Sequence, residues 1–228
     1  MRRRTWGFLC IGFGLLVLAS FTVGCGSSSS NGQIRLVNAT PDESGLDLLV
    51  DTKITANGVA YGAASAYSSI SSGARNLQVE PTGGTNVLID TTPTIGGGNT
   101  LTLVTLNFSF NISSVLLTDD NSAPTSGDFK LRILNASPGI GSQDVYLVPF
   151  GTDISSVDPT FSNVGFGSAA SYSMLTAGDY EVFFTTPGQK FINLDSGKLT
   201  FAAGQIRTLI ALNNPAGAFM STLLTDAN

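Results

Sequence analysis

The segment Ile34-Arg-Leu-Val-Asn-Ala-Thr-Pro41 decides the fold, because it returns almost unchanged as Leu131-Arg-Ile-Leu-Asn-Ala-Ser-Pro138. The two segments start 97 residues apart. Each is a short apolar run that ends in Asn and Pro, and both residues favour turns. The chain therefore contains two tandem copies of one repeat unit, and each copy begins with a strand followed by a turn.

Further repeated segments follow in the same order along the chain. Residues 59–67 match 164–172 at an offset of 105, so the second copy has gained eight residues before this point. Both copies end in Leu-Leu-Thr-Asp, at 116–119 and at 223–226. We predict a first copy over residues 34–120, a linker over 121–128 and a second copy over 129–228, because the linker is rich in turn-forming residues.

Each copy consists of short runs rich in Val, Leu, Ile, Thr and Phe that are separated by Gly, Pro, Asn and Asp. This pattern predicts seven strands per copy and no helix. The expected fold class is all-β, with two tandem antiparallel β-sandwich domains; immunoglobulin-like and transthyretin-like topologies both stay open. The predicted strands are 34–38, 46–51, 65–70, 75–80, 86–90, 100–108 and 114–118, then 130–134, 143–149, 170–174, 179–185, 191–194, 205–212 and 219–224.

The first 25 residues have the features of an export signal. Three arginines precede an uncharged stretch, Thr5 to Val23, and a small residue precedes Cys25. This ending resembles a bacterial lipobox, although Thr22 stands where Leu is usual. We expect residues 1–24 to be a lipoprotein signal peptide and residues 25–33 to be the lipidated Cys and a flexible tether. The alternatives are an uncleaved membrane helix, for which about 19 residues suffice, and a secreted form.

The predicted localisation is the cell envelope, where the lipid on Cys25 would bind the membrane. Gly26 follows this Cys, as in lipoproteins that cells with two membranes send to the outer membrane. Several acyl chains on one Cys pass the threshold for stable anchoring.

Composition excludes several chemistries. The chain has no His, so it lacks a Ser-His-Asp triad and any His-ligated zinc or haem. Three of the 11 basic residues precede Cys25 and all 16 acidic residues follow it, so the mature net charge is −8. That charge is a poor match to the phosphates of nucleic acid. We therefore expect no enzyme activity, no cofactor, no metal and no nucleic-acid partner.

Two charged pairs recur with the same separation of twelve residues: Arg35 with Asp47, and Arg132 with Asp144. If the first two strands of each copy formed a hairpin, an Arg–carboxylate pair would fix its register. We predict this structural role for all four residues. A carboxylate directed at a substrate is the alternative.

Asn38 and Asn135 both precede Ala, then Ser or Thr, then Pro. An Asn side chain accepts a hydrogen bond from the backbone two residues on, so each is predicted to close the turn after the first strand. A ligand-binding loop presented by both copies is the alternative.

Four aromatic residues recur at matched positions: Tyr61, Tyr67, Phe166 and Tyr172. They are candidate binding residues if they form a platform for sugar rings or a peptide. They are core residues if the hydroxyls bond to the backbone, and we favour this interpretation. The acidic ends of the copies, at Asp119 and Asp226, are either solvated or ligands for calcium.

The N-A-[ST]-P turn, the Asp on the next strand, the [YF]-G-x-A-x-x-Y-S segment and the later Gly turn together resemble the domain of unknown function 4397 family. The resemblance extends over nearly all of residues 34–228. It implies exported bacterial proteins, often in tandem copies and often lipid-anchored. It implies no known activity and no established catalytic residues.

These observations favour a non-catalytic binding or scaffolding module for a glycan or an envelope protein. A purely structural envelope spacer is the first alternative. A carboxylate-dependent hydrolase is the second, since paired acids hydrolyse glycosides.

Overall fold

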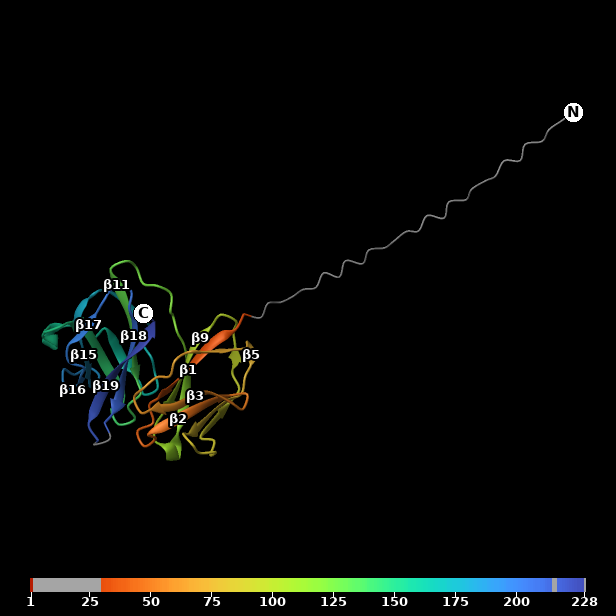
Figure 1. The fold of residues 1–228 in the computed structure, drawn as a ribbon. Helices are drawn as coiled ribbons and strands as arrows, with labels where there is room; N and C mark the ends of the chain where they lie inside the picture. Colours follow the sequence, from red (N-terminus) through yellow and green to blue (C-terminus); the bar gives the residue numbers. More distant parts are fainter. Residues whose placement is uncertain (2–29, 215–216, 228) are drawn as a thin grey trace.

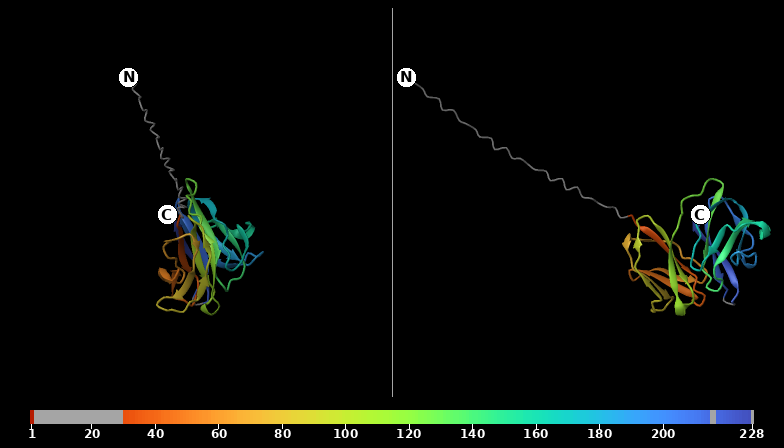
Figure 2. Two further views of the ribbon diagram at one scale, coloured as in Figure 1. Left: turned by 90° about the vertical axis from the view of Figure 1, so that its right-hand side faces the viewer. Right: turned by 180° about the vertical axis from the view of Figure 1, so that it is seen from behind.

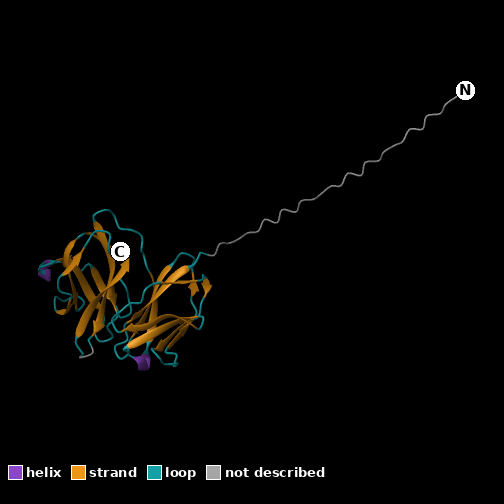
Figure 3. Cartoon of the chain, in the orientation of Figure 1, coloured by secondary structure: helices purple, strands orange, loops and turns teal. Residues whose placement is uncertain are grey.

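The computed structural model describes residue 1, residues 30–214 and residues 217–227 of the 228-residue chain. The predicted signal peptide and Cys25 lie outside these ranges. Within them, no helix has the length and apolar character needed to cross a membrane. The all-β prediction is confirmed: two β-sandwiches lie side by side, with two 3-10 helices, η1 (Ser109–Asn111) and η2 (Ile154–Ser156) (Figures 1 and 3).

The first sandwich packs an inner sheet, in the order β10-β9-β1-β4, on an outer sheet, in the order β3-β2-β6-β7. A two-stranded sheet, β5-β8, lies at one end. The strands are β1 (Gly32–Asn38), β2 (Gly45–Val50), β3 (Lys53–Ala60), β4 (Ser68–Ile70), β5 (Gly73–Ala74), β6 (Leu77–Pro81), β7 (Ile89–Thr91), β8 (Thr94–Ile95), β9 (Thr100–Leu106) and β10 (Ser113–Thr118).

The second sandwich has the same plan. Its inner sheet has the order β14-β11-β18-β19, and its outer sheet has the order β13-β12-β15-β16, with β17 also paired to β15. The strands are β11 (Asp128–Asn135), β12 (Gln143–Pro149), β13 (Phe161–Val164), β14 (Ser173–Thr176), β15 (Gly178–Thr185), β16 (Ile192–Asp195), β17 (Leu199–Phe201), β18 (Ile206–Asn213) and β19 (Phe219–Ala227).

The two inner sheets pack against each other, so the molecule has four layers. On β1, Ile34 and Leu36 belong to the core of the first sandwich. Val37, on the other face of the strand, packs in a separate core with Leu134 and Ile210 of the second sandwich. A strand buried on both faces reads as a continuous apolar run, which explains the repeated segment that opens each copy. Figure 2 shows the two sandwiches in contact from behind.

One strand pair in each inner sheet runs parallel, a detail that the sequence did not predict. Leu36 on β1 lies beside Leu103 on β9, and Ile133 on β11 lies beside Leu209 on β18. A parallel pair needs a long crossover, and the strands of the outer sheet supply it. The first two strands of each copy therefore lie in different sheets.

The prediction of seven strands per copy is too low: the described residues form ten strands in the first sandwich and nine in the second, and β3 is among those missed. Its residues, KITANGVA, are mostly polar or small, and the strand pairs with β2 through two register shifts. An edge strand with such irregularities shows no alternation of apolar and polar residues, so periodicity does not reveal it.

The longer connection in the second copy covers a sheet face. It contains η2, and Ile154 from this helix packs with Tyr146, Val148 and Phe183 on the outer sheet. Lys190 lies over the ring of Tyr146, 4.4 Å from its centroid. The extra residues therefore form a small additional core.

Candidate functional site

A closed ring of six buried polar side chains joins the two sandwiches. The guanidinium of Arg35 donates through Nη2 to Asp226, and the side chains of this pair are 1% and 0% exposed. Asp226 also accepts from Thr208 Oγ1 at 2.6 Å. Thr208 in turn accepts from Arg132 Nε at 3.1 Å. Half of the ring therefore runs from the first sandwich into the second and ends on the second arginine.

The other half repeats these contacts with the two copies exchanged. Arg132 Nη2 donates to Asp119 Oδ1 at 2.7 Å, and Thr102 Oγ1 donates to Asp119 Oδ2 at 2.6 Å. Arg35 Nε closes the ring on Thr102 Oγ1 at 2.8 Å. Each copy thus gives an arginine to the aspartate of the other copy. The six members of this interlock ring are Arg35, Thr102, Asp119, Arg132, Thr208 and Asp226.

Two of the candidate aromatic residues cover the interlock ring. The Tyr67 hydroxyl donates to Asp119 Oδ2 at 2.7 Å, and the Tyr172 hydroxyl donates to Asp226 Oδ2 at 2.8 Å. Each ring also has an arginine guanidinium over one face, at 4.6 Å for Tyr67 and 4.7 Å for Tyr172. These contacts occupy the hydroxyl and one face of each tyrosine, so the interpretation as a free sugar platform does not fit them.

The prediction that Arg35 pairs with Asp47 is wrong, and so is the prediction that Arg132 pairs with Asp144. Arg35 lies on β1 of the inner sheet, whereas Asp47 lies on β2 of the outer sheet. Because the two strands form no hairpin, the twelve-residue spacing does not bring the side chains together. The actual partners come from the other sandwich.

Asp47 and Asp144 instead hold the outer sheets in shape. Asp47 accepts from the Gly58 backbone N at 2.7 Å and from Thr82 Oγ1 at 2.7 Å. Asp144 accepts from the backbone N of Asn163 at 2.7 Å and of Gly188 at 2.8 Å. Gly58 and Asn163 both have positive φ, 65° and 55°, so each Asp fixes a matched irregular backbone position. Both oxygens of each carboxylate therefore accept structural hydrogen bonds.

Asn38 and Asn135 are fully buried and bridge loops within each copy. Asn38 Oδ1 accepts from the Thr40 backbone N at 3.0 Å, the predicted turn, and Asn38 Nδ2 donates to the carbonyls of Glu43 and Val59 at 2.9 and 3.1 Å. Asn135 makes the matching contacts in the second copy. The turn leads to the other sheet rather than into a hairpin, and its buried amide leaves no ligand-binding group exposed.

The last two candidates differ from each other. The Tyr61 hydroxyl donates to the Asn213 carbonyl of the second sandwich. Phe166, the matched residue, has no hydroxyl, and it is 37% exposed. The glycine that follows each of them has φ of +74° and lies close to a leucine of the other copy. This repeated motif therefore marks the contact between the sandwiches.

Burial makes the tyrosine hydroxyls of this contact hard to ionise. It raises the pKa of Tyr67 to about 12, because burial outweighs the nearby positive charge of Arg35. It also raises the pKa of Tyr61 to about 12 and raises that of Tyr172 further. Burial alone would lower the pKa of Arg35, but the Asp226 carboxylate reverses this and the net pKa is raised.

These shifts predict a loss of stability at alkaline pH. An unfolded Tyr has a pKa of about 10. A folded-state pKa above that value gives stability that is complete below pH 10 and is lost as the pH rises through about 12. We expect the urea midpoint to fall as the pH rises through this window. In the double variant Tyr67→Phe/Tyr172→Phe, the midpoint should fall less steeply with pH. An unchanged slope in that variant would contradict the assignment.

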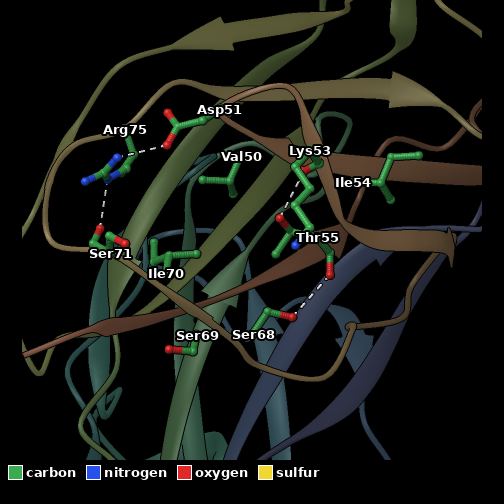
Figure 4. Close-up of a pocket in the computed structure, with 10 residues that line it drawn as sticks. All are labelled: Val50, Asp51, Lys53, Ile54, Thr55, Ser68, Ser69, Ile70, Ser71 and Arg75. Carbon is green, nitrogen blue, oxygen red and sulfur yellow. Dashed lines mark hydrogen bonds and ion pairs between the residues drawn. The ribbon is translucent and has the colours of Figure 1, made fainter.

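A groove opens on the first sandwich, and none of its lining residues belongs to the interlock ring (Figure 4). Its volume is about 340 Å³, within the usual range for small-ligand sites. Val50 and Ile70, members of the first core, lie between two polar sides. Lys53 and Thr55 lie on one side, and Asp51 and Arg75 on the other; Ile54, Ser68, Ser69 and Ser71 complete the lining.

A strained turn builds one wall of this groove. Val50 pairs with Lys53, so Asp51 and Thr52 form a two-residue hairpin turn, and their φ angles are 49° and 67°. Positive φ is costly for a β-branched residue such as Thr52. Strain of this kind persists only where the surroundings impose it, and it is frequent at binding sites. The second copy has the longer connection with η2 here, so the turn is specific to the first copy.

Sequence patterns did not reveal the groove, because its residues come from the edge strands β3 and β4, the end of β2 and the connections around them, without a motif. Among the described residues, no group of three His, Cys, Asp or Glu side chains could hold a metal ion. Both interpretations of Asp119 and Asp226 are wrong. The two side chains are 0% exposed rather than solvated, and arginine, tyrosine and threonine occupy both carboxylates in place of calcium.

The family model described as Domain of unknown function (DUF4397) matches residues 32–146. The chain belongs to this family. The DUF4397 match covers half of the chain: the whole first sandwich, strand β11 and the beginning of β12. The matched residues include the buried Asn38 and Asn135 and both arginines of the interlock ring. No curated protein matches the sequence.

The solved structures to which the chain is similar are distant. The carbohydrate-binding module CBMbc (family CBM26) of Eubacterium rectale Amy13K, in complex with maltoheptaose, is 13% identical with a TM-score of 0.28; 87% of this chain and 98% of that one are covered. The multi-modular glycogen-degrading pneumococcal virulence factor SpuA is 10% identical with a TM-score of 0.27, over 85% of this chain. The Bacillus anthracis TIE protein is 12% identical with a TM-score of 0.28, over 85%. The chain spans only 22% and 34% of the last two, and similarity at this level does not establish a shared ligand.

Proposed function

We propose that this DUF4397 protein is a non-catalytic binding module of the cell envelope, and that the groove of the first sandwich holds part of a glycan. The groove carries the proposal: it combines an apolar floor with hydroxyl and charged groups at its rim. Ligand sites have this composition, because apolar surface supplies affinity and a few polar groups supply orientation. A non-catalytic role is supported by the four acids at matched positions, which are all engaged in structural hydrogen bonds.

The proposal includes two copies of the family domain and a lipid on Cys25. Support for two copies comes from the repeated sequence and from the matched strand pairings of the two sandwiches. Support for the lipid comes from the lipobox-like residues 22–25. The anchor would be in the outer membrane of a cell that has two membranes, and the interlock ring would let both domains move on the tether as one body.

Glycan binding is tested by titrating the protein with polysaccharide fractions from the envelope of the cells that produce it. Ser71 is an exposed groove residue whose side chain makes no hydrogen bond to another described residue, so Ser71→Trp should fold and obstruct the groove. We expect binding by the unmodified protein and by Ser162→Trp, an exposed site on β13, and a loss of at least about tenfold in Ser71→Trp. If no fraction binds, or if both variants bind equally, the protein is better described as a spacer.

The anchor is tested by fractionating cells that produce the protein or its Cys25→Ala variant. A single lipidated Cys predicts that the parent protein is in the membrane fraction and that the variant is soluble. Protease added to intact cells then distinguishes display outside the cell from a periplasmic location. Membrane retention of the Cys25→Ala variant would identify the apolar segment as an uncleaved anchor.

A further inference from the structure

Lys53 stands out among the cations of the described chain. Lys130 and Lys198 form ion pairs, and Lys190 donates to a backbone carbonyl. The Lys53 ammonium has no hydrogen bond or ion pair to any described residue, although it lies on the rim of the groove. It is an unpaired positive charge on a protein with a strong net negative charge.

The second cation of the groove is already neutralised. Arg75 Nη1 donates to Asp51 Oδ2 at 3.0 Å, and its other nitrogens donate to the carbonyls of Ser71 and Ser72. The strained hairpin turn holds Asp51 in this position, and Asp51 also accepts from the Asn76 backbone N at 3.1 Å. The groove therefore has one unpaired charge rather than two.

The hydroxyl groups beside Lys53 are oriented by the protein. Thr55 Oγ1 donates to the Lys53 carbonyl at 3.1 Å, and Ser68 Oγ donates to the Thr55 carbonyl at 3.1 Å. Because both hydroxyl hydrogens point to the backbone, their free lone pairs accept hydrogen bonds from a ligand. Next to them, Ile54, which is 55% exposed, offers an apolar surface, and the buried Val50 and Ile70 lie below it as the floor. A sugar ring has this combination of hydroxyl donors and an apolar face.

We propose that the groove binds an acidic sugar unit, a uronate, with its carboxylate on Lys53 and its hydroxyls on Thr55 and Ser68. The inference rests on the proposed glycan-binding function and names the class of glycan. One unpaired ammonium matches one carboxylate, and a charge-assisted hydrogen bond of this kind is about twice as strong as a neutral one. The Arg75–Asp51 pair borders the sugar on the opposite side.

The position of the groove is consistent with a ligand near the membrane surface. Ser69 on its rim accepts from Asn31 Nδ2 at 3.2 Å, and Ile70 pairs with Gly32 at the start of β1. If Cys25 carries the lipid, five residues lie between it and Asn31, so the chain can span at most about 20 Å between the two. The groove would then meet the polysaccharide layer next to the membrane.

The test uses the full mature protein in detergent, with a tetramer of galacturonate as the probe and its carboxyl-reduced, neutral form as the comparison. We expect the galacturonate tetramer to bind about tenfold more tightly than the neutral form and to weaken as salt is added. Lys53→Gln should remove this preference, and Lys53→Arg should retain most of it. Lys198→Gln, whose charge lies on the second sandwich, is the matched control and should bind like the parent.

The outcomes separate this inference from the function on which it rests. Equal binding of both tetramers, with no effect of Lys53→Gln but a loss in Ser71→Trp, would overturn the acidic ligand and leave glycan binding intact. Absence of binding for every glycan, acidic or neutral, would overturn both. Lys53-dependent binding to vesicles with anionic phospholipid, without binding to galacturonate, would also overturn the uronate assignment.

Discussion

Replacing Asp119 by Ala lowers the free energy of unfolding by about 3–5 kcal/mol, the usual cost of leaving a buried charge without its partner. The Asp119 side chain is 0% exposed, and it accepts hydrogen bonds from Arg132, Tyr67 and Thr102. Its loss leaves the Arg132 guanidinium, 4% exposed, without a counter-charge. Urea denaturation followed by fluorescence and circular dichroism measures the change.

The matched control is Asp179→Ala, which breaks the pair with Lys198. Those two side chains are 45% and 48% exposed, so solvent screens the pair and the loss should be far smaller than in Asp119→Ala. If Asp119→Ala does not fold, Asp119→Asn keeps the shape and one acceptor oxygen, and it measures the loss of the charge together with the second acceptor. A loss below about 1 kcal/mol in both Asp119 variants would mean that the interlock ring adds little to stability.

Because the ring crosses between copies, its loss also affects cooperativity. With Arg132 and Asp119 paired, unfolding of either sandwich exposes a buried charge in the other, and one shared transition is expected. Without Asp119, the coupling between the sandwiches is reduced to the Arg35–Asp226 pair, the Tyr61–Asn213 hydrogen bond and the apolar contacts of the central core. Asp119→Ala is therefore expected to separate the transition into two steps, and probes in different domains will no longer coincide.

The sequence predicts the two-sandwich fold well because its evidence is local. Short apolar runs, turn residues and the repeat lie along the chain itself, and they indicate β-strands without knowledge of their partners. The partner of Arg35 is different, since Asp226 is 191 residues away. A twelve-residue spacing to Asp47 offered a nearer acid, and only the placement of β1 and β2 in different sheets excludes it.

One signal in the sequence did point to a buried arginine. Ile34, Leu36 and Val37 surround Arg35, so a strand with these residues has two apolar faces. A charge in such a strand must be buried, and a buried charge needs an opposite charge. The repeated Asp at the end of each copy supplies it. The groove gave no such signal, because its polar residues are those of an ordinary edge and turn.

Replacing Gly167 by Val is expected to cost about 2–5 kcal/mol. Gly167 has φ of +74°, a conformation that costs other residues about 1–2 kcal/mol. A Cβ at this position would also lie 3.1 Å from Leu106 Cδ1 of the first sandwich. Leu106 is 4% exposed and belongs to the central core, so it has little room to move, and overpacking adds about 1–3 kcal/mol.

Gly188→Val separates the cost of the backbone conformation from the cost of the contact with Leu106, because Gly188 has φ of +70° and no atom within 4 Å of the Cβ position. This variant should lose only the stability that corresponds to the backbone conformation. The additional loss at Gly167 then measures the contact between the sandwiches. In the double variant Leu106→Ala/Gly167→Val, the smaller side chain makes room for the valine. The double variant should therefore lose less unfolding free energy than the sum of the losses in the two single variants. Full additivity, or equal losses at both glycines, would show that the repeated Gly serves only the turn and that the sandwiches do not depend on close approach at this point.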